Sequence, residues 1–160
     1  MIRTLLIMAL ALSAQSFAQA PGVGFDPSKK TEIDAARAEW RDGGRVVIAE
    51  GGVSISQPGV ILTAERMEVT VVEGSDEVER VVATGRVRYA SVNGDAIAGE
   101  RAVYSAAEGT LIVTGRVVVV QEGQVATGHE LTYNTETGAI LLVAEPGGRV
   151  RGLLAERDGS

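Results

Sequence analysis

Three titratable side chains occupy matching places in this sequence and are its candidates for chemistry. Glu65, Glu100 and His129 each follow directly after an Ala or a Gly within similar stretches of sequence. Two carboxylates that face each other can supply the acid and the base of a hydrolase. Charges at equivalent positions of a repeat more often form a corner motif that bonds nearby backbone amides. Both interpretations of Glu65 and Glu100 stay open from the sequence.

Other catalytic and metal-binding chemistry lacks the residues that it needs. The chain has one His and no Cys, so His129 has no second imidazole or thiolate with which to hold a metal ion. We therefore expect His129 to be structural or solvent-facing. The glycine pair Gly147-Gly148 lacks the lysine and the helix start of a phosphate-binding loop. The sequence predicts a protein that is not an enzyme and has no metal or cofactor.

The stretches that carry these side chains are copies of one repeat. The phrase at residues 62–69 recurs at 97–104, at 126–133 and more faintly at 33–40. A second phrase alternates with it, as the following segments show: 49–55, 83–89 and 113–119. Repetition at a period of about thirty residues predicts supersecondary units that stack on one another.

The repeats have the pattern of β-strands. Val53 and Ile55 alternate with Ser54 and Ser56, which is typical of a strand with one apolar face. The apolar positions change from even to odd numbers within the phrase at 62–69, and the same kind of change occurs in its copies. An extra residue re-aims the side chains that follow it, so we predict a β-bulge or corner at three small residues, Ala64, Gly99 and Gly128.

The predicted fold class is all-β. Repeated strand–bulge–strand units favour an open antiparallel β-jelly roll, a two-walled β-sandwich with an interior of Val, Ile and Leu. Residues 117–120 are apolar on both faces, which indicates either a strand covered on both sides or an outer face that meets a partner.

The two ends of the chain differ from the repeats. A basic start, an apolar stretch from Leu5 to Leu12 and Ala18-Gln19-Ala20 predict a cleavable secretory signal at residues 1–20. A retained anchor is the alternative, but the apolar run is shorter than the roughly twenty residues that span a bilayer. We expect a flexible segment at 21–30, one domain at 31–154 and a flexible tail at 155–160. The formal charge of −6 argues against nucleic acid as a partner.

At these phrases the chain resembles the LptA/OstA family of lipopolysaccharide-transport proteins. The family pattern is an apolar residue, a spacer, Ala or Gly and then an acidic residue, followed downstream by a Thr-Gly-x-Val element. It is filled here by Leu62-x-Ala64-Glu65, Ile97-x-Gly99-Glu100 and Ala126-x-Gly128-His129, with Thr84-Gly85-Arg86-Val87 and Thr114-Gly115-Arg116-Val117 downstream. The sequence departs from the pattern at His129 and Ala36, which occupy the acidic slot, and its scarcity of Phe indicates a groove lined by Val.

The resemblance implies a periplasmic carrier that binds the acyl chains of lipid A in an apolar groove while the polar head stays wet. Each candidate for the groove wall also has a plain interpretation as ordinary core, and a structural scaffold with a filled interior is the alternative function. An LptC-like component is a further alternative, although Ala18-Gln19-Ala20 favours the soluble one. The candidates for the wall are Ile33, Val46, Ile48, Val53, Ile55, Leu62, Met67, Val69, Val87, Tyr89, Ile97, Tyr104, Val117, Val119, Leu131 and Tyr133.

The resemblance also implies head-to-tail assembly into a bridge between an inner-membrane LptC-like protein and an outer-membrane LptD-like protein. The open edges of a sheet can accept a strand from a neighbour. The edges are expected near residues 31–40 and 139–154, although 139–144 is equally compatible with a core strand. We expect Trp40 to pack at the end of a strand rather than to serve as a platform for a sugar. The edge candidates are Thr31, Ile33, Trp40, Ile140, Leu142 and Val150.

Overall fold

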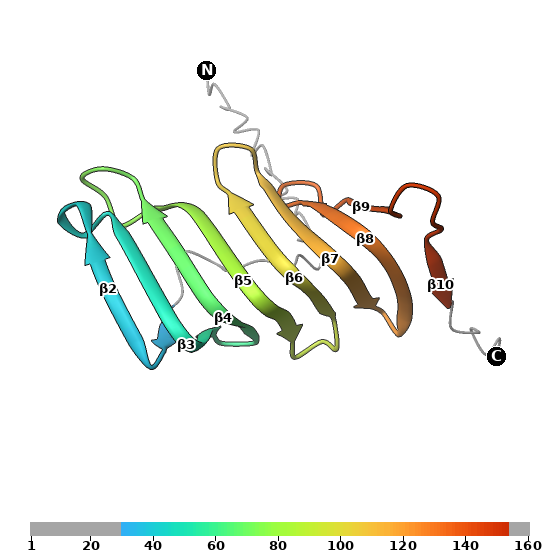
Figure 1. The fold of residues 1–160 in the computed structure, drawn as a ribbon, viewed down its shortest axis with the longest axis horizontal. Helices are drawn as coiled ribbons and strands as arrows, with labels where there is room; N and C mark the ends of the chain where they lie inside the picture. Colours follow the sequence, from blue (N-terminus) through green and yellow to red (C-terminus); the bar gives the residue numbers. More distant parts are fainter. Residues whose placement is uncertain (1–29, 154–160) are drawn as a thin grey trace, which may run out of the picture.

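A computed structural model describes residues 30–153, which form a single antiparallel sheet of ten strands (Figure 1). The predicted signal at 1–20, almost all of the segment at 21–30 and the tail at 155–160 lie outside the described residues. The strands are β1 (Glu32–Asp34), β2 (Arg37–Arg41), β3 (Val46–Gln57), β4 (Val60–Val71), β5 (Val78–Ser91), β6 (Ala96–Ser105), β7 (Thr110–Gln121), β8 (Gln124–Asn134), β9 (Ile140–Val143) and β10 (Arg151–Leu153).

The predicted all-β class is confirmed. One 3₁₀ turn at Asp42–Gly44 accompanies the strands of residues 30–153. Among these residues there is no helix with the length and apolar character needed to cross a membrane.

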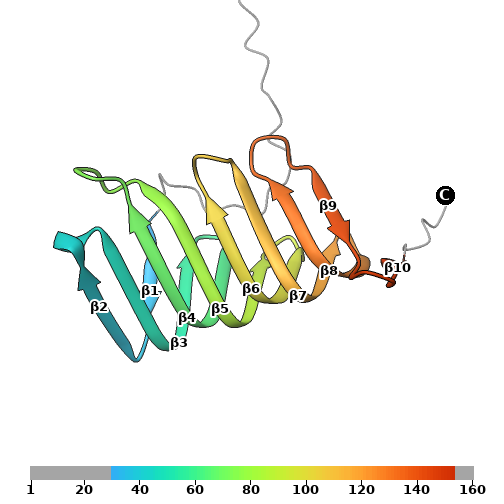
Figure 2. The same ribbon diagram turned by 45° about the horizontal axis from the view of Figure 1, so that its top comes forward.

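The sheet folds into two walls because its long strands bend near their middles (Figure 2). Strands β3 to β8 follow one another as a meander, and each edge is divided between two short strands. At one edge, β1 pairs with the second half of β3 and β2 pairs with the first half. At the other edge, β9 and β10 divide β8 in the same way. We call the two layers the β1/β10 wall and the β2/β9 wall.

The strands bend at the predicted places, next to Ala64, Gly99 and Gly128. The inserted pairs of residues, however, lie on the neighbouring strands β3, β5 and β7. The register shifts between Thr63 and Arg66 in β4, and equivalent shifts occur along β6 and β8. Opposite them, β3, β5 and β7 each insert a pair of residues with positive φ: Gly51-Gly52, Gly85-Arg86 and Gly115-Arg116. A pair of added residues keeps the face alternation of its strand, whereas the single residue opposite, such as Glu65, reverses it.

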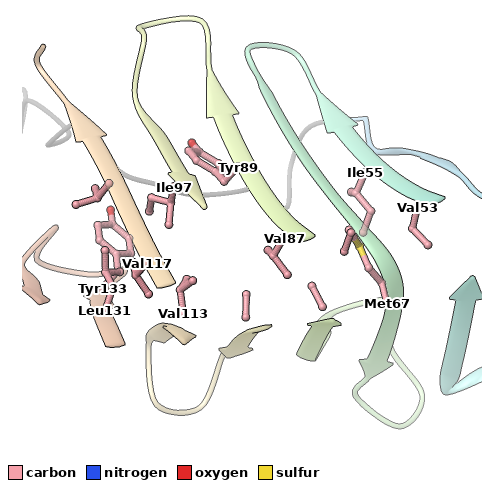
Figure 3. Packing of buried hydrophobic residues seen from close by; sticks show 14 of the residues in the cluster. Val53, Ile55, Met67, Val87, Tyr89, Ile97, Val113, Val117, Leu131 and Tyr133 are labelled. Atoms are coloured by element: carbon pink, nitrogen blue, oxygen red, sulfur yellow. The ribbon is translucent and has the colours of Figure 1, made fainter. Parts of the chain in front are cut away.

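The apolar core lies between the walls (Figure 3). Leu131 and Tyr133 from β8, Met67 from β4 and Val113 and Val117 from β7 are almost completely inaccessible to solvent. The small side chains Ala49, Ala83 and Ala102 complete the layer close to the bend. Close packing of these side chains joins the walls and stabilises the fold, because each one is removed from water.

Candidate functional site

Most of the predicted wall residues face the space between the walls. Ten belong to the buried core and two, Leu62 and Val69, pack against it: the ten are Val53, Ile55, Met67, Val87, Tyr89, Ile97, Val117, Val119, Leu131 and Tyr133. Tyr104 shares this inner face, because it lies opposite Val81 and Leu111 in the register. Ile33 lies opposite Ile55 at the edge and is 54% exposed. Whether these residues bind lipid stays a prediction.

Val46 and Ile48 are corrections to that set, since both lie on the outer face of the β2/β9 wall. Ile48 lies opposite Glu68, whereas the next residue, Ala49, lies opposite the buried Met67. Directly opposed residues point to the same side of a sheet, so Ile48 points to the outer face, where it is only 5% exposed but does not belong to the core cluster. The two glycines of the β3 bulge keep the alternation unchanged, and odd-numbered residues therefore face inward along the whole of β3. The sequence pattern does not reveal how many residues a bulge holds.

The inner face is closed in the middle, and depressions lie at both edges of the sheet. The one at the β1 edge, of about 350 Å³, is mostly polar and is lined by Glu32, Ile33, Asp34, Ser54 and Ser56. A cavity of about 230 Å³ lies between β7, β8, β9 and β10, and its apolar lining includes Val119, Ala126, Ile140 and Leu142. Gly152, which is paired with Ala126, also lines it and contributes no side chain to fill it. Ligand pockets usually hold roughly 300–1,000 Å³, so this cavity is small for a ligand unless the walls separate.

The two repeated carboxylates form ion pairs across the bend. Arg86 Nε donates to Glu65 Oε1 at 2.8 Å, and Arg116 Nε donates to Glu100 Oε1 at 3.0 Å. Each carboxylate thus has its own guanidinium on the next strand, and the two carboxylates are not paired with each other. The partner of each carboxylate is an arginine side chain, whereas the corner motif was expected to bond backbone amides. Neither pair has the arrangement of a hydrolase.

His129 occupies the same slot as these glutamates in β8 and is exposed. Among residues 30–153 there is no group of three or more His, Cys, Asp or Glu side chains that could hold a metal ion.

The edge at β1 and β2 leaves apolar side chains uncovered. Trp40 lies opposite Val47 near the end of β2 and is 67% exposed, so it is not the packed strand-end residue that the sequence predicted. Thr31 Oγ1 accepts a hydrogen bond of 2.8 Å from Gln57 Nε2, which ties the start of β1 to β3. On the outer face of β2, the hydrogen bond and charge of Arg41 lower the pKa of the Glu39 carboxyl.

The edge at β9 and β10 is also open. Ile140 and Leu142 are half-buried and face inward, opposite Tyr133 and Leu131 respectively. Val150 is 45% exposed in the segment that joins β9 to β10. Both edges thus present inward-facing apolar side chains next to unpaired strand backbone.

Comparison with known proteins identifies the family to which the repeat belongs. A family model described as "LptA/(LptD N-terminal domain) LPS transport protein" matches residues 32–139. The chain belongs to this LptA/LptD N-terminal domain family. The match runs from β1 through β8, so it includes every bulge pair and both Glu–Arg ion pairs.

A solved structure shows the same fold. The crystal structure of LptH, the LptA homologous periplasmic component of the lipopolysaccharide transport device from Pseudomonas aeruginosa, has a TM-score of 0.67 with this chain at 19% sequence identity. The similarity covers 80% of this chain and 96% of LptH. A search of curated proteins gives no match. The LptA-type β-jelly roll is therefore the fold of this member of the family.

Proposed function

We propose that this protein is a periplasmic carrier of lipopolysaccharide that holds the acyl chains of lipid A between its two walls. The observation that carries the proposal is the continuous apolar inner face, which ends in an apolar cavity at β8 to β10. Membership of a lipopolysaccharide-transport family supports the substrate. The secretory signal predicted at residues 1–20 supports a location in the periplasm.

Loading of acyl chains requires the walls to move apart. The cavity of about 230 Å³ is too small for several chains, and the middle of the inner face is filled by buried side chains. Acyl chains and Val, Ile and Leu side chains are similarly apolar, so one set of contacts can replace the other at low cost. The open side of the sandwich leaves the sugar and phosphate groups in water.

Head-to-tail assembly is the second part of the proposal. In this sheet β9 and β10 run antiparallel to β1 and β2, so a second copy in the same orientation can continue the sheet. In that arrangement β9 lies beside β2, and β10 lies beside β1. Trp40 and Ile140 stand at opposite ends of one cross-strand row, so a sheet continued in the same register brings the exposed Trp40 opposite Ile140 of the neighbouring copy. The same edges are proposed to meet LptC-like and LptD-like partners.

Charge supports this arrangement on the outer face of the β1/β10 wall. Glu32 and Asp34 point outward from β1, opposite Ser56 and Ser54. Arg151 points outward from β10, opposite Thr127, and Arg149 precedes it by two residues. The acidic edge of one copy and the basic edge of the next would therefore attract each other.

A structural scaffold is the second candidate function, because the middle of the core is filled. It predicts an inner face that never contacts lipid. The two functions are separated by photo-crosslinking of lipopolysaccharide to purified mature protein with a photoreactive residue at Leu142 or at Leu141. Leu142 lines the cavity, and its neighbour Leu141 is exposed on the outer face of the same strand.

The carrier predicts adducts at position 142 and few at position 141, although position 141 is the more accessible of the two. Equal labelling at both positions, or none at 142, would favour the scaffold. Both positions are leucines next to each other in β9, so the two variants differ in the face of the strand that carries the probe. Circular dichroism checks that both variants fold.

A further inference from the structure

The two Glu–Arg ion pairs at the bend each use an arginine with positive φ, a geometry that the sequence pattern does not predict. We propose that they act as two latches that bias the angle between the walls in the middle of the groove, while the β9/β10 end stays adjustable and widens for lipid. Each latch consists of a glutamate, the glycine that it covers and the arginine that it binds: Glu65 with Gly85 and Arg86, and Glu100 with Gly115 and Arg116. The lipid part of this inference rests on the proposed carrier function.

Each latch joins two neighbouring strands at the point where both bend. A Cβ atom on Gly85 would lie 2.8 Å from Glu65 Cβ and 2.8 Å from its carboxyl carbon. Gly115 has the same relation to Glu100, with the same two distances of 2.8 Å. The glutamate side chain therefore lies directly on the glycine, and the arginine that follows reaches back to the carboxylate.

The arginines hold a backbone conformation that is unfavourable for them. Arg86 has a φ of 46° and Arg116 a φ of 44°, in the left-handed region that favours glycine. The bulge of β3 fills the corresponding position with Gly52, so the fold itself has a version without the arginine. Strained residues persist where the surrounding structure holds them and are often part of a mechanism. The ion pairs that they make account for the presence of arginine, rather than glycine, at these two positions.

The latch is missing at both ends of the groove. At the β1/β2 edge, the acidic slot holds Ala36, whose Cβ lies 2.6 Å from the place of a Cβ on Gly51. In β8 the slot holds His129, and the neighbouring residues 144–150 form no strand. The cavity lies at this same end, between β7 and β10. The β1/β2 end also lacks the ion pair, but Ala36 packs tightly on Gly51 there, whereas the β9/β10 end combines a missing latch with the apolar hollow, so the wall angle can change at that end.

The strength of a latch suits a device that biases an angle without locking it. The side chains of Arg86 and Glu65 are 81% and 56% exposed, and ion pairs this exposed shift an equilibrium by about twofold to fivefold each. The contact between the glutamate and the bare glycine adds a steric limit that salt does not screen.

The test measures the wall angle with pairs of nitroxide labels, which the absence of native cysteine makes straightforward. Labels at Arg80 and Ala90, both exposed on outer faces of β5, report the middle of the groove. Labels at Leu141 and Leu153 report the β9/β10 end. We expect a narrow distance distribution in the middle and a broader one at the end, which shifts to longer distances when lipopolysaccharide is added.

The decisive variant is R86G/R116G, which copies the natural Gly-Gly bulge of β3 and should fold. It should broaden the middle distribution and leave the end distribution unchanged. R88A/R101A is the matched control, because it removes two exposed arginines outside the latches and should change neither. E65Q/E100Q removes only the charge of the latch and should broaden the middle distribution in part.

An unchanged middle distribution in R86G/R116G, or equal widths at the middle and the end of the native protein, would overturn the latches. Failure of the carrier function would give a different experimental result. In that case the label distances would behave as expected without lipid, and lipopolysaccharide would neither shift the Leu141–Leu153 pair nor form adducts at position 142.

Discussion

Replacement of Gly85 by Ala gives a prediction whose size follows from two separate costs. Gly85 has a φ of 82°, and a side chain in the left-handed region costs about 1–2 kcal/mol. The added methyl group also overlaps Glu65, and such overpacking costs about 1–3 kcal/mol. We expect G85A to lower the free energy of unfolding by about 2–5 kcal/mol, a large part of the stability of a domain of this size.

Gly74 is the matched control, because its φ is 75° and nothing lies within 4 Å of the place of its Cβ. G74A should therefore cost only the backbone part, about 1–2 kcal/mol. The E65G background should remove the overlap, because it takes away both the Cβ and the carboxyl group that the new methyl group meets, and it should reduce the effect of G85A to a similar value. Urea denaturation followed by circular dichroism measures all four proteins. If G85A costs no more than G74A, or E65G fails to relieve it, the close approach of Glu65 to Gly85 is refuted.

Two further predictions concern the core and the edge. L131A should lower the free energy of unfolding by about 2–5 kcal/mol, since Leu131 is 0% exposed, whereas L153A at a 77% exposed site should change it by less than about 0.5 kcal/mol. Equal losses in urea denaturation would contradict the inward placement of Leu131. Trp40, the only tryptophan, should shift its emission to shorter wavelength as concentration rises, and I140A should weaken this shift. A spectrum independent of concentration would contradict the edge junction.

Much of the fold could be predicted because its signals are local. The alternation around Val53 and Ile55 reports a strand with one buried face wherever that strand lies. The bends were foreseen at Ala64, Gly99 and Gly128 because a change of alternation is written in the chain itself. The resemblance to the LptA/OstA family followed from the same repeats and is confirmed by the family match.

The errors all involve partners that are distant in sequence. Ile48 was placed in the groove because it is apolar, but its face depends on the pairing with Glu68, twenty residues away. Trp40 was expected to pack, but it lies on an edge strand that pairs on one side only, with β3, among the described residues, and it is 67% exposed. Arg86 carried no signal as the partner of Glu65, because the interaction needs the left-handed backbone that the bulge creates.

The sequence by itself determined the strand class and the repeat, since these depend on residues within about thirty positions of one another. Only the tertiary structure decided which faces meet, how far the walls close and where the hollow lies. These properties depend on cross-strand register and on side-chain volume summed over both walls. Gly152 has no side chain, which helps to leave the cavity at the β9/β10 end, and no local sequence pattern predicts that cavity.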